Sequence, residues 1–306
     1  AKIAGLNVLR LMNEHAATAL AYGIYRTKEF DAEEPTYAAF GHMGHSGFNV
    51  SIVGFCAQKL EVIAVEHSIK CGGRDMDEIL MRHFAEEFMK KNKLDPDDQN
   101  PLKNKKSRVK LEDAVVKCKK ILSANDQAPI NIECLLEDYD LSGLMKRDEF
   151  TEVIKSKGLI TEVEETIDRC IQKALKSGGN QLEWALDSID QLAYVEIVGG
   201  ASRVPWFQEV MKAKFGKELS RTLNADECVA RGCALQAAIL SPLYKVRDFA
   251  VDDKCARSIT VTWEGSSSDK KESEEKEGEA AGEGEKKDGD GDAEMGESGK
   301  SEKNIK

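Results

Sequence analysis

The stretch Val195-Glu-Ile-Val-Gly-Gly-Ala-Ser-Arg203 decides the fold of this chain. Its apolar half predicts a buried strand, and the helix that follows begins near Pro205, at a position where proline is favoured. The two glycines between them let a ligand approach the backbone, and the N-terminus of a helix favours an anion. The stretch is therefore typical of a nucleotide-binding turn. Taken alone, it fits a tight strand-to-helix connection without a ligand equally well.

Strands and helices alternate on both sides of this stretch. Predicted strands cover residues 37–55, as two strands joined by a glycine-rich turn, and residues 60–65, 130–134 and 192–198. Predicted helices cover residues 6–25, 76–92, 111–122, 161–176 and 226–240, and a further helix starts within residues 202–205. This alternation indicates an α/β fold.

Composition and charge narrow the classes of function. Of the 306 residues, 41% are hydrophobic, enough for a sizeable core, and the formal net charge is -11. The segment from Gly265 onward holds 14 acidic and 8 basic residues, so the acidity is concentrated there, and we expect no nucleic-acid partner. Residues 265–306 lack aromatic side chains and are predicted to be a disordered acidic tail.

The same composition argues against membrane spans and disulfides. No apolar run approaches the ~20 residues that a membrane span needs, so we expect no membrane partner. The eight cysteines contain no Cys-x-x-Cys pair, which suggests free thiols in a reducing compartment. The N-terminus has none of the features of a signal peptide, and we expect a cytoplasmic or nuclear protein.

A second glycine-rich turn, Gly41-His-Met-Gly-His-Ser-Gly47, joins two predicted strands. The backbone N–H groups of such a turn are suited to cradling phosphate oxygens. The local pattern is short, and an ordinary β-hairpin turn is the stronger alternative when the pattern is taken alone.

The sequence contains two patterns that could indicate a metal site, and both are weak. The range 138–149 has the spacing of a calcium loop, but the segment before it contains Pro129 and alternates like a strand, where an EF-hand needs a helix. His42 and His45 flank the glycine turn without a nearby cluster of cysteines or carboxylates. We therefore predict no protein-ligated metal site at either place.

Further motifs occur in a fixed order along the chain. They are Ala4-Gly-Leu-Asn-Val-Leu-Arg10, Asn13-Glu14, Ala21-Tyr-Gly23, Gly72-Gly73, Val198-Gly-Gly-Ala-Ser-Arg203, Leu223-Asn-Ala-Asp-Glu227 and Gln236-Ala-Ala-Ile-Leu240. Together they resemble the ATPase domain of the seventy-kilodalton heat-shock superfamily, over about Lys2 to Trp263.

Other details resemble the large, hundred-and-ten-kilodalton branch of that superfamily. They are Ala21-Tyr-Gly-Ile-Tyr25, Met43-Gly-His-Ser46, Leu122-Ser-Ala-Asn125, Ile132-Glu-Cys134, Leu223-Asn-Ala-Asp226, Arg231-Gly-Cys-Ala-Leu-Gln236 and Tyr244-Lys-Val-Arg247. In that branch the calcium-like range 138–149 belongs to the helical subdomain of lobe two.

The resemblance implies an actin-like (ribonuclease H-like) fold of two lobes with ATP or ADP and Mg²⁺ in the cleft. It implies that this chain begins just before lobe two, without the first phosphate loop and the lysine of lobe one. Glu14 matches the catalytic glutamate that approaches the magnesium-bound water. The residues assigned to the nucleotide are Gly44, His45, Ser46 and Gly47 of the second phosphate loop, Lys119, Lys120 and Ser123 of the adenosine-side helix, Gly199, Gly200, Ala201 and Arg203 of the adenosine loop, and Asp226, which closes that loop. Gly73 is assigned to the nucleotide as well.

Three positions depart from the family pattern. His42 stands where the family has an aspartate that organises the magnesium, and Asn49 stands where the seventy-kilodalton members have another. Val116 replaces a glutamate expected to hold the ribose. Because a magnesium site relies on carboxylate charge, these changes argue against hydrolysis by this chain.

The resemblance implies an ATP-binding chaperone or nucleotide-exchange co-chaperone, with a seventy-kilodalton chaperone and unfolded proteins as partners. Exchange is conformational and needs no protein nucleophile. Two alternatives stay open: an active ATPase or sugar-kinase-like enzyme of the same superfold, and an interaction module that binds no nucleotide. The expected domains are residues 1–243, a partial nucleotide-binding domain that is mainly lobe two; residues 244–264, a linker and the first strand of a client-binding β-domain; and the tail, residues 265–306.

Overall fold

The computed structural model describes residues 1–246, 248–254 and 260. The predicted tail lies outside the described residues, and so does the predicted strand at residues 258–263 except for Thr260. Ala1–Ala256 form one unit, which is described here by itself. Within the described residues, no helix combines the length and the apolar character that a membrane crossing requires.

The described residues form a six-stranded mixed sheet in the order β7-β6-β1-β2-β3-β8. Its strands are β1 (Thr36–Met43), β2 (Phe48–Cys56), β3 (Lys59–Ser68), β6 (Leu192–Val198), β7 (Leu219–Ser220) and β8 (Ala250–Asp252). The first three strands pair as an antiparallel meander, whereas β6 runs parallel to β1. Because β1 and β6 are parallel, the turns that follow them lie at the same end of the strands.

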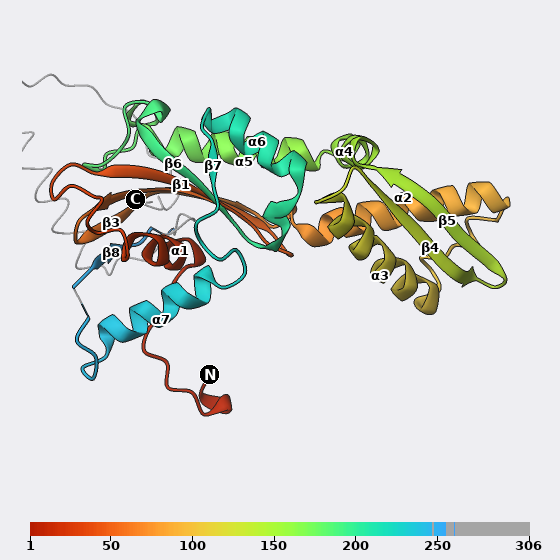
Figure 1. Ribbon diagram of the computed structural model, residues 1–306, viewed down its shortest axis with the longest axis horizontal. Coiled ribbons are helices and arrows are strands. Elements are labelled where there is room, and N and C mark those ends of the chain that lie inside the picture. Colours follow the sequence, from red (N-terminus) through yellow and green to blue (C-terminus); the bar gives the residue numbers. More distant parts are fainter. Residues whose placement is uncertain (247, 255–259, 261–306) are drawn as a thin grey trace, which may run out of the picture. The chain divides into compact units, whose positions relative to one another are not determined.

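Helices cover both faces of this sheet. Figure 1 shows α5 (Leu159–Ala174) and α6 (Pro205–Phe215) over one face, and α1 (Glu14–Gly23) and α7 (Cys228–Leu240) over the other. Along β1, Phe40 packs into the core beneath α1, and Met43 packs into the core beneath α5 and α6. Because both faces are covered, every residue of β2 except Asn49 is buried.

A second group of elements follows β3. It consists of α2 (Gly73–Asn92), α3 (Lys105–Leu122), the antiparallel hairpin β4 (Gln127–Leu136) and β5 (Tyr139–Lys146), and α4 (Arg147–Ser156). The calcium-like spacing falls on the hairpin turn, β5 and the start of α4. The Asp140 carboxylate accepts the backbone N–H of Cys134 at 2.7 Å, so it stabilises the hairpin.

Short 3-10 turns complete the described chain. They are η1 (Lys2–Ala4), η2 (Lys176–Gly178), η3 (Ile189–Gln191) and η4 (Gly200–Arg203). In η4 the chain turns directly from the end of β6 toward α6, and Pro205 is the first residue of that helix, as the sequence predicts.

The predicted helix over residues 6–25 is wrong in its first half. The helix begins at Glu14, and Asn13 has an extended backbone. The apolar side chains of Leu6, Leu9 and Leu11 are exposed. A short helix in water is marginal unless a face is packed, so the favourable pattern of residues 6–13 does not produce a helix.

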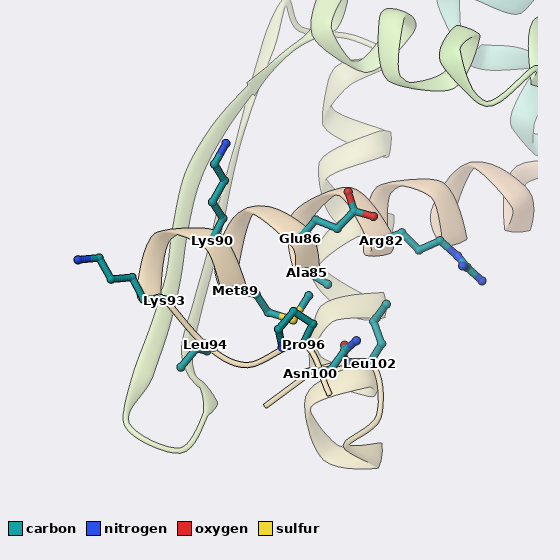
Figure 2. Close-up of a pocket in the computed structure, with 10 residues that line it drawn as sticks. All are labelled: Arg82, Ala85, Glu86, Met89, Lys90, Lys93, Leu94, Pro96, Asn100 and Leu102. Carbon is teal, nitrogen blue, oxygen red and sulfur yellow. Dashed lines mark hydrogen bonds between the residues drawn. The ribbon is translucent and has the colours of Figure 1, made fainter. Parts of the chain in front are cut away.

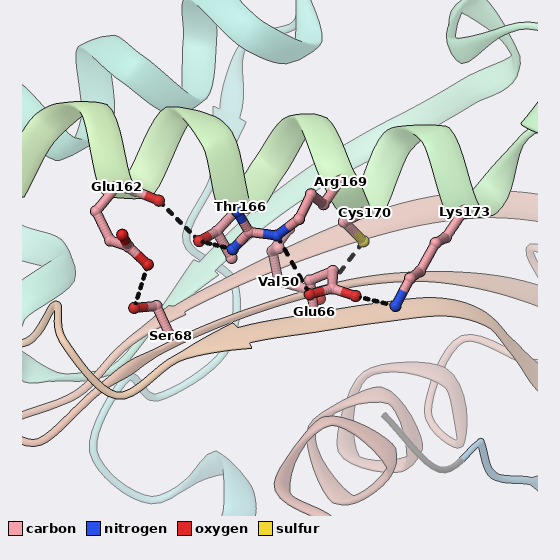
Figure 3. Close-up of polar contacts among 8 residues, drawn as sticks. All are labelled: Val50, Glu66, Ser68, Glu162, Thr166, Arg169, Cys170 and Lys173. Atoms are coloured by element: carbon pink, nitrogen blue, oxygen red, sulfur yellow. Dashed lines mark hydrogen bonds and ion pairs between the residues drawn. The ribbon is translucent and has the colours of Figure 1, made fainter. Parts of the chain in front are cut away.

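Figure 3 shows the polar contacts that attach α5 to the sheet. Glu66 of β3 forms ion pairs with Arg169 and Lys173 of α5, and Ser68 donates a hydrogen bond to Glu162 at 2.7 Å. The Glu66 side chain is nearly buried, whereas the side chains of Arg169 and Lys173 are about half exposed. These contacts fix α5 over β3 in addition to the apolar core.

The chain returns to the sheet near its described end. Ala250–Asp252, within the segment predicted to be a linker, forms β8 and pairs in parallel with β3. Asp253 then accepts hydrogen bonds from Asn13 at 2.8 Å and pairs with His15 at 2.9 Å. This segment therefore connects the far edge of the sheet to the beginning of α1.

Candidate functional site

Four separate segments meet around Gly73, the first residue of α2. A Cβ atom at this position would lie 3.5 Å from Ala201 Cβ, 3.5 Å from Lys119 Nζ and 3.6 Å from the Gly44 carbonyl oxygen. These neighbours belong to η4, α3 and the β1–β2 turn. The structure thus brings together one residue from each of the groups that the sequence assigns to the nucleotide. We call this place the Gly73 cradle.

The β1–β2 turn is held against the start of α2 by backbone hydrogen bonds. Gly44 N–H donates to the Gly47 carbonyl at 3.0 Å, and the Gly73 N–H donates to the Gly44 carbonyl at 2.9 Å. Arg74 N–H donates to the carbonyl of His45 at 2.8 Å. The predicted phosphate loop is therefore a rigid turn whose position is fixed by the N-terminus of α2.

The turn after β6 depends on glycine. Gly199 has φ 89° and ψ 147°, a conformation that residues with a Cβ rarely adopt. A Cβ there would also lie 2.3 Å from the Met43 carbonyl oxygen. The Gly199 N–H donates to the Ala225 carbonyl at 2.9 Å, and the Ser202 hydroxyl donates to the Gly199 carbonyl at 2.7 Å. The turn is consequently attached both to β1 and to the loop before α7.

Asp226 closes this turn through an ion pair. Its Oδ2 atom lies 2.7 Å from Nη2 of Arg203, and both side chains are more than half exposed. Such an exposed pair contributes little stability, so it is free to rearrange around a ligand. A cavity of about 470 Å³ lies beside the pair. It is lined by Ile197, Ser202, Arg203, Arg221, Leu223, Asn224, Ala225 and Asp226.

Glu196 positions the closing loop, and the sequence analysis missed it. This carboxylate is fully buried in β6 and accepts the backbone N–H groups of Thr222 at 2.5 Å and Leu223 at 2.8 Å. It therefore fixes the loop that leads to Asp226. The signal available in the sequence was one charged residue inside an otherwise apolar strand, where an unpaired charge would be costly.

Lys119 is placed in the site by a buried partner. Its ammonium group lies 2.7 Å from the Asp77 carboxylate and donates to the Gly73 carbonyl at 2.8 Å. Burial raises the pKa of Asp77 above its usual value, and Lys119 partly offsets that effect. Of the other two residues predicted on this helix, Lys120 is exposed, and the Ser123 hydroxyl donates to the Lys119 carbonyl at 3.1 Å.

Glu14, His42 and Asn49 converge where the family resemblance places the magnesium. Asn49 donates to the Glu14 carboxylate at 3.2 Å, and His42 Nδ1 lies 3.7 Å from the same carboxylate. Burial lowers the pKa of His42, which favours the neutral imidazole. Magnesium prefers oxygen ligands in octahedral geometry, and this group supplies a single carboxylate. The donor set does not fit Mg²⁺.

A second cavity, of about 540 Å³, lies at the C-terminal end of α2 (Figure 2). Its base is apolar, with Met89, Leu94 and Leu102, and Arg82 and Lys90 stand at its rim. None of the residues predicted to bind nucleotide lines this cavity. It is therefore separate from the Gly73 cradle.

Known proteins are similar to this chain over most of its length. The family model "Hsp70 protein" matches residues 1–278. The chain is 45% identical over 275 residues to heat shock 70 kDa protein 4 of Canis lupus familiaris, with 87% of the chain and 30% of that relative covered. It is 41% identical over 269 residues to heat shock 70 kDa protein 14 of Arabidopsis thaliana, with 88% of the chain and 30% of that relative covered. The chain thus spans about 30% of the length of these relatives.

Proposed function

The chain belongs to the Hsp70 family, and from this premise we propose that its described residues form the second lobe of a nucleotide-binding domain in a chaperone of the large branch. Members of this family bind ATP or ADP with Mg²⁺. In this chain the nucleotide would lie against the Gly73 cradle, with the adenosine side at η4 and the phosphates toward the β1–β2 turn.

The meeting of four segments at Gly73 carries this proposal. Gly44, Ala201 and Lys119 are far apart in the sequence. Nevertheless, an atom of each lies within 3.6 Å of one point, the position that a Cβ atom of residue 73 would occupy. The point is bordered by the start of α2 and by two glycine turns, so it joins the three groups of residues that are predicted to bind the nucleotide. A strand-to-helix connection without a ligand has no need for this second glycine turn.

The chain's own residues would bind and orient the nucleotide without a nucleophile. The Arg203–Asp226 pair would bound the adenosine side, and His45 and Ser46 of the β1–β2 turn would present their backbone to the phosphates. Because the group of Glu14, His42 and Asn49 supplies one carboxylate, we propose a role in nucleotide exchange on an Hsp70 partner.

Replacing Gly73 with alanine is expected to weaken nucleotide binding about tenfold or more. The added methyl group would fit without a clash, because its nearest neighbours are 3.5 Å away, so the fold should persist. It would nevertheless occupy the space that the nucleotide needs, and overpacking by one methyl group costs about 1–3 kcal/mol. Binding of fluorescent ATP and ADP to the purified chain measures the effect.

Gly143→Ala is the matched control for this variant. Gly143 lies in β5, and a Cβ there would meet Ile130 Cγ2 at 3.5 Å and no other atom within 4 Å. This variant should bind nucleotide like the wild type. Equal affinities for Gly73→Ala and the wild type, with equal thermal unfolding midpoints, would place the nucleotide elsewhere.

An exchange assay distinguishes the proposed role from the two alternatives. An Hsp70 chaperone loaded with fluorescent ADP is expected to release the ADP faster when this chain is added. The chain alone should hydrolyse ATP no faster than buffer without protein does. Turnover by the chain would favour an ATPase. Faster release without any ATP binding by the chain would favour an interaction module that has no nucleotide.

A further inference from the structure

Among the residues that the structure describes, His83, Glu87 and Glu149 form a group of three potential metal ligands outside the nucleotide site. His83 Nε2 lies 3.6 Å from Glu87 Oε1 and 4.0 Å from Glu149 Oε1. The three ligand atoms lie within 4.8 Å of one another. His83 and Glu87 are one helical turn apart on α2, and Glu149 comes from the first turn of α4.

The Nε2 atom of His83, at the centre of this group, has no hydrogen-bond partner among the residues that the structure describes. His83 Nε2 is shielded from solvent, although both carboxylates stand nearby, because 3.6 Å and 4.0 Å are too long for hydrogen bonds. The ring as a whole is 22% exposed, and the two carboxylates are 55% and 44% exposed. His83 is thus the more buried member of the group, and the carboxylates of Glu87 and Glu149 are accessible to solvent.

Backbone contacts orient the third ligand. Glu149 occupies the third position of α4, and its Oε2 atom accepts the backbone N–H of Lys146 at 3.5 Å, in the manner of a capping box. Its other oxygen, Oε1, is the one directed to His83. Such an outer contact fixes the orientation of a metal-ligating carboxylate.

These separations suit a small divalent ion. In a tetrahedral zinc site with ligand bonds of about 2.0–2.1 Å, neighbouring ligand atoms are about 3.3 Å apart. The distances of 3.6 Å and 4.0 Å from His83, and the separation of at most 4.8 Å between the two carboxylate oxygens, would reach that value through side-chain adjustments. Imidazole together with carboxylates selects zinc and its transition-metal neighbours, whereas Mg²⁺ and Ca²⁺ prefer sites made only of oxygen.

We propose that His83, Glu87 and Glu149 form a binding site for Zn²⁺, with three protein ligands and an open position for water. The ion would join α2 to α4, two helices that contact each other in the second group of elements. It would neutralise two carboxylates that now face one imidazole. The site is distinct from the Gly73 cradle, so nucleotide binding does not require it.

Titration of the full chain with Zn²⁺ and Co²⁺, after alkylation of its thiols, tests the proposal. Alkylation removes the exposed Cys134 and Cys233 as competing ligands. The wild type is expected to bind one zinc ion that Mg²⁺ and Ca²⁺ do not displace. Bound Co²⁺ should give a visible spectrum without a thiolate charge-transfer band. Zinc should also raise the midpoint of thermal unfolding.

The variants His83→Gln and Glu87→Gln are expected to weaken zinc binding at least about tenfold and to lose the thermal shift. Glu86→Gln is the matched control, because Glu86 neighbours Glu87 but belongs to the separate cavity at the end of α2. It should bind zinc like the wild type. If His83→Gln does not fold, Glu87→Gln still tests the site, because Glu87 is mostly exposed. Zinc affinities within twofold of the wild type in both folded variants, or in Glu87→Gln alone, would overturn the proposal.

Discussion

Replacing Gly199 with alanine is expected to lower the free energy of unfolding by about 3 kcal/mol or more and to abolish nucleotide binding. Two costs add at this residue. The backbone conformation, with φ 89°, is strained for any residue with a side chain, and the new Cβ would lie 2.3 Å from the Met43 carbonyl oxygen. Because that oxygen belongs to the backbone of β1, the clash is relieved only if β1 and β6 move apart. Urea unfolding followed by circular dichroism measures the loss.

Gly200→Ala is the matched control, one residue further along the chain. Its Cβ would lie 3.6 Å from Asp226 Oδ1 and 3.9 Å from Arg203 Nη1, both at ordinary contact distance. We expect a small change in the free energy of unfolding. If this variant has a larger effect, it should be on the affinity for nucleotide. Equal unfolding midpoints for Gly199→Ala and Gly200→Ala would show that the β6 turn is not the constrained element described above.

The variant Lys119→Met is expected to lower the free energy of unfolding by about 3–5 kcal/mol at pH 7, because it leaves a buried carboxylate without its cation. Lys119 and Asp77 are 11% and 8% exposed, and their charged atoms are 2.7 Å apart. Lys119→Met would also remove the hydrogen bond to the Gly73 carbonyl, so nucleotide binding should weaken as well. Urea unfolding and ATP binding measure the two effects separately.

The loss in Lys119→Met should depend on pH, and a double variant should reverse most of it. Burial raises the pKa of Asp77, so its carboxyl group binds a proton more tightly in the folded state than in the unfolded chain. Stability from such a group is present at low pH and is lost as the pH rises through its folded pKa. Without Lys119 the pKa of the folded Asp77 is higher still, so the loss of stability continues to higher pH. The free energies of unfolding of the wild type and the variant should therefore differ more at pH 7 than at pH 5. The double variant Lys119→Met/Asp77→Leu should recover most of the stability, and a loss equal at both pH values would contradict this account.

Most strands, most helices and the glycine turns could be predicted because their signals are local, whereas β5, β7, β8 and α4 were not predicted. The apolar run of residues 192–198 needs no distant partner to indicate a strand, and Pro205 marks the first residue of a helix wherever the helix packs. The first half of the helix predicted for residues 6–25 did not form, for the opposite reason. Its pattern is favourable, but the structure leaves Leu9 and Leu11 exposed, and a short unpacked helix is not stable.

The sequence by itself determined the α/β class and the turn at Gly199-Gly200, because backbone propensity, hydrophobic period and glycine geometry act over a few residues. It indicated the family through the resemblance of its motifs and their order along the chain. Only the tertiary structure decided that Lys119 is paired with Asp77, that Glu196 fixes the loop before Asp226, and that His83 faces Glu149. Those contacts join residues far apart in the chain. They exist because the helices and strands pack in one arrangement, which no local pattern specifies.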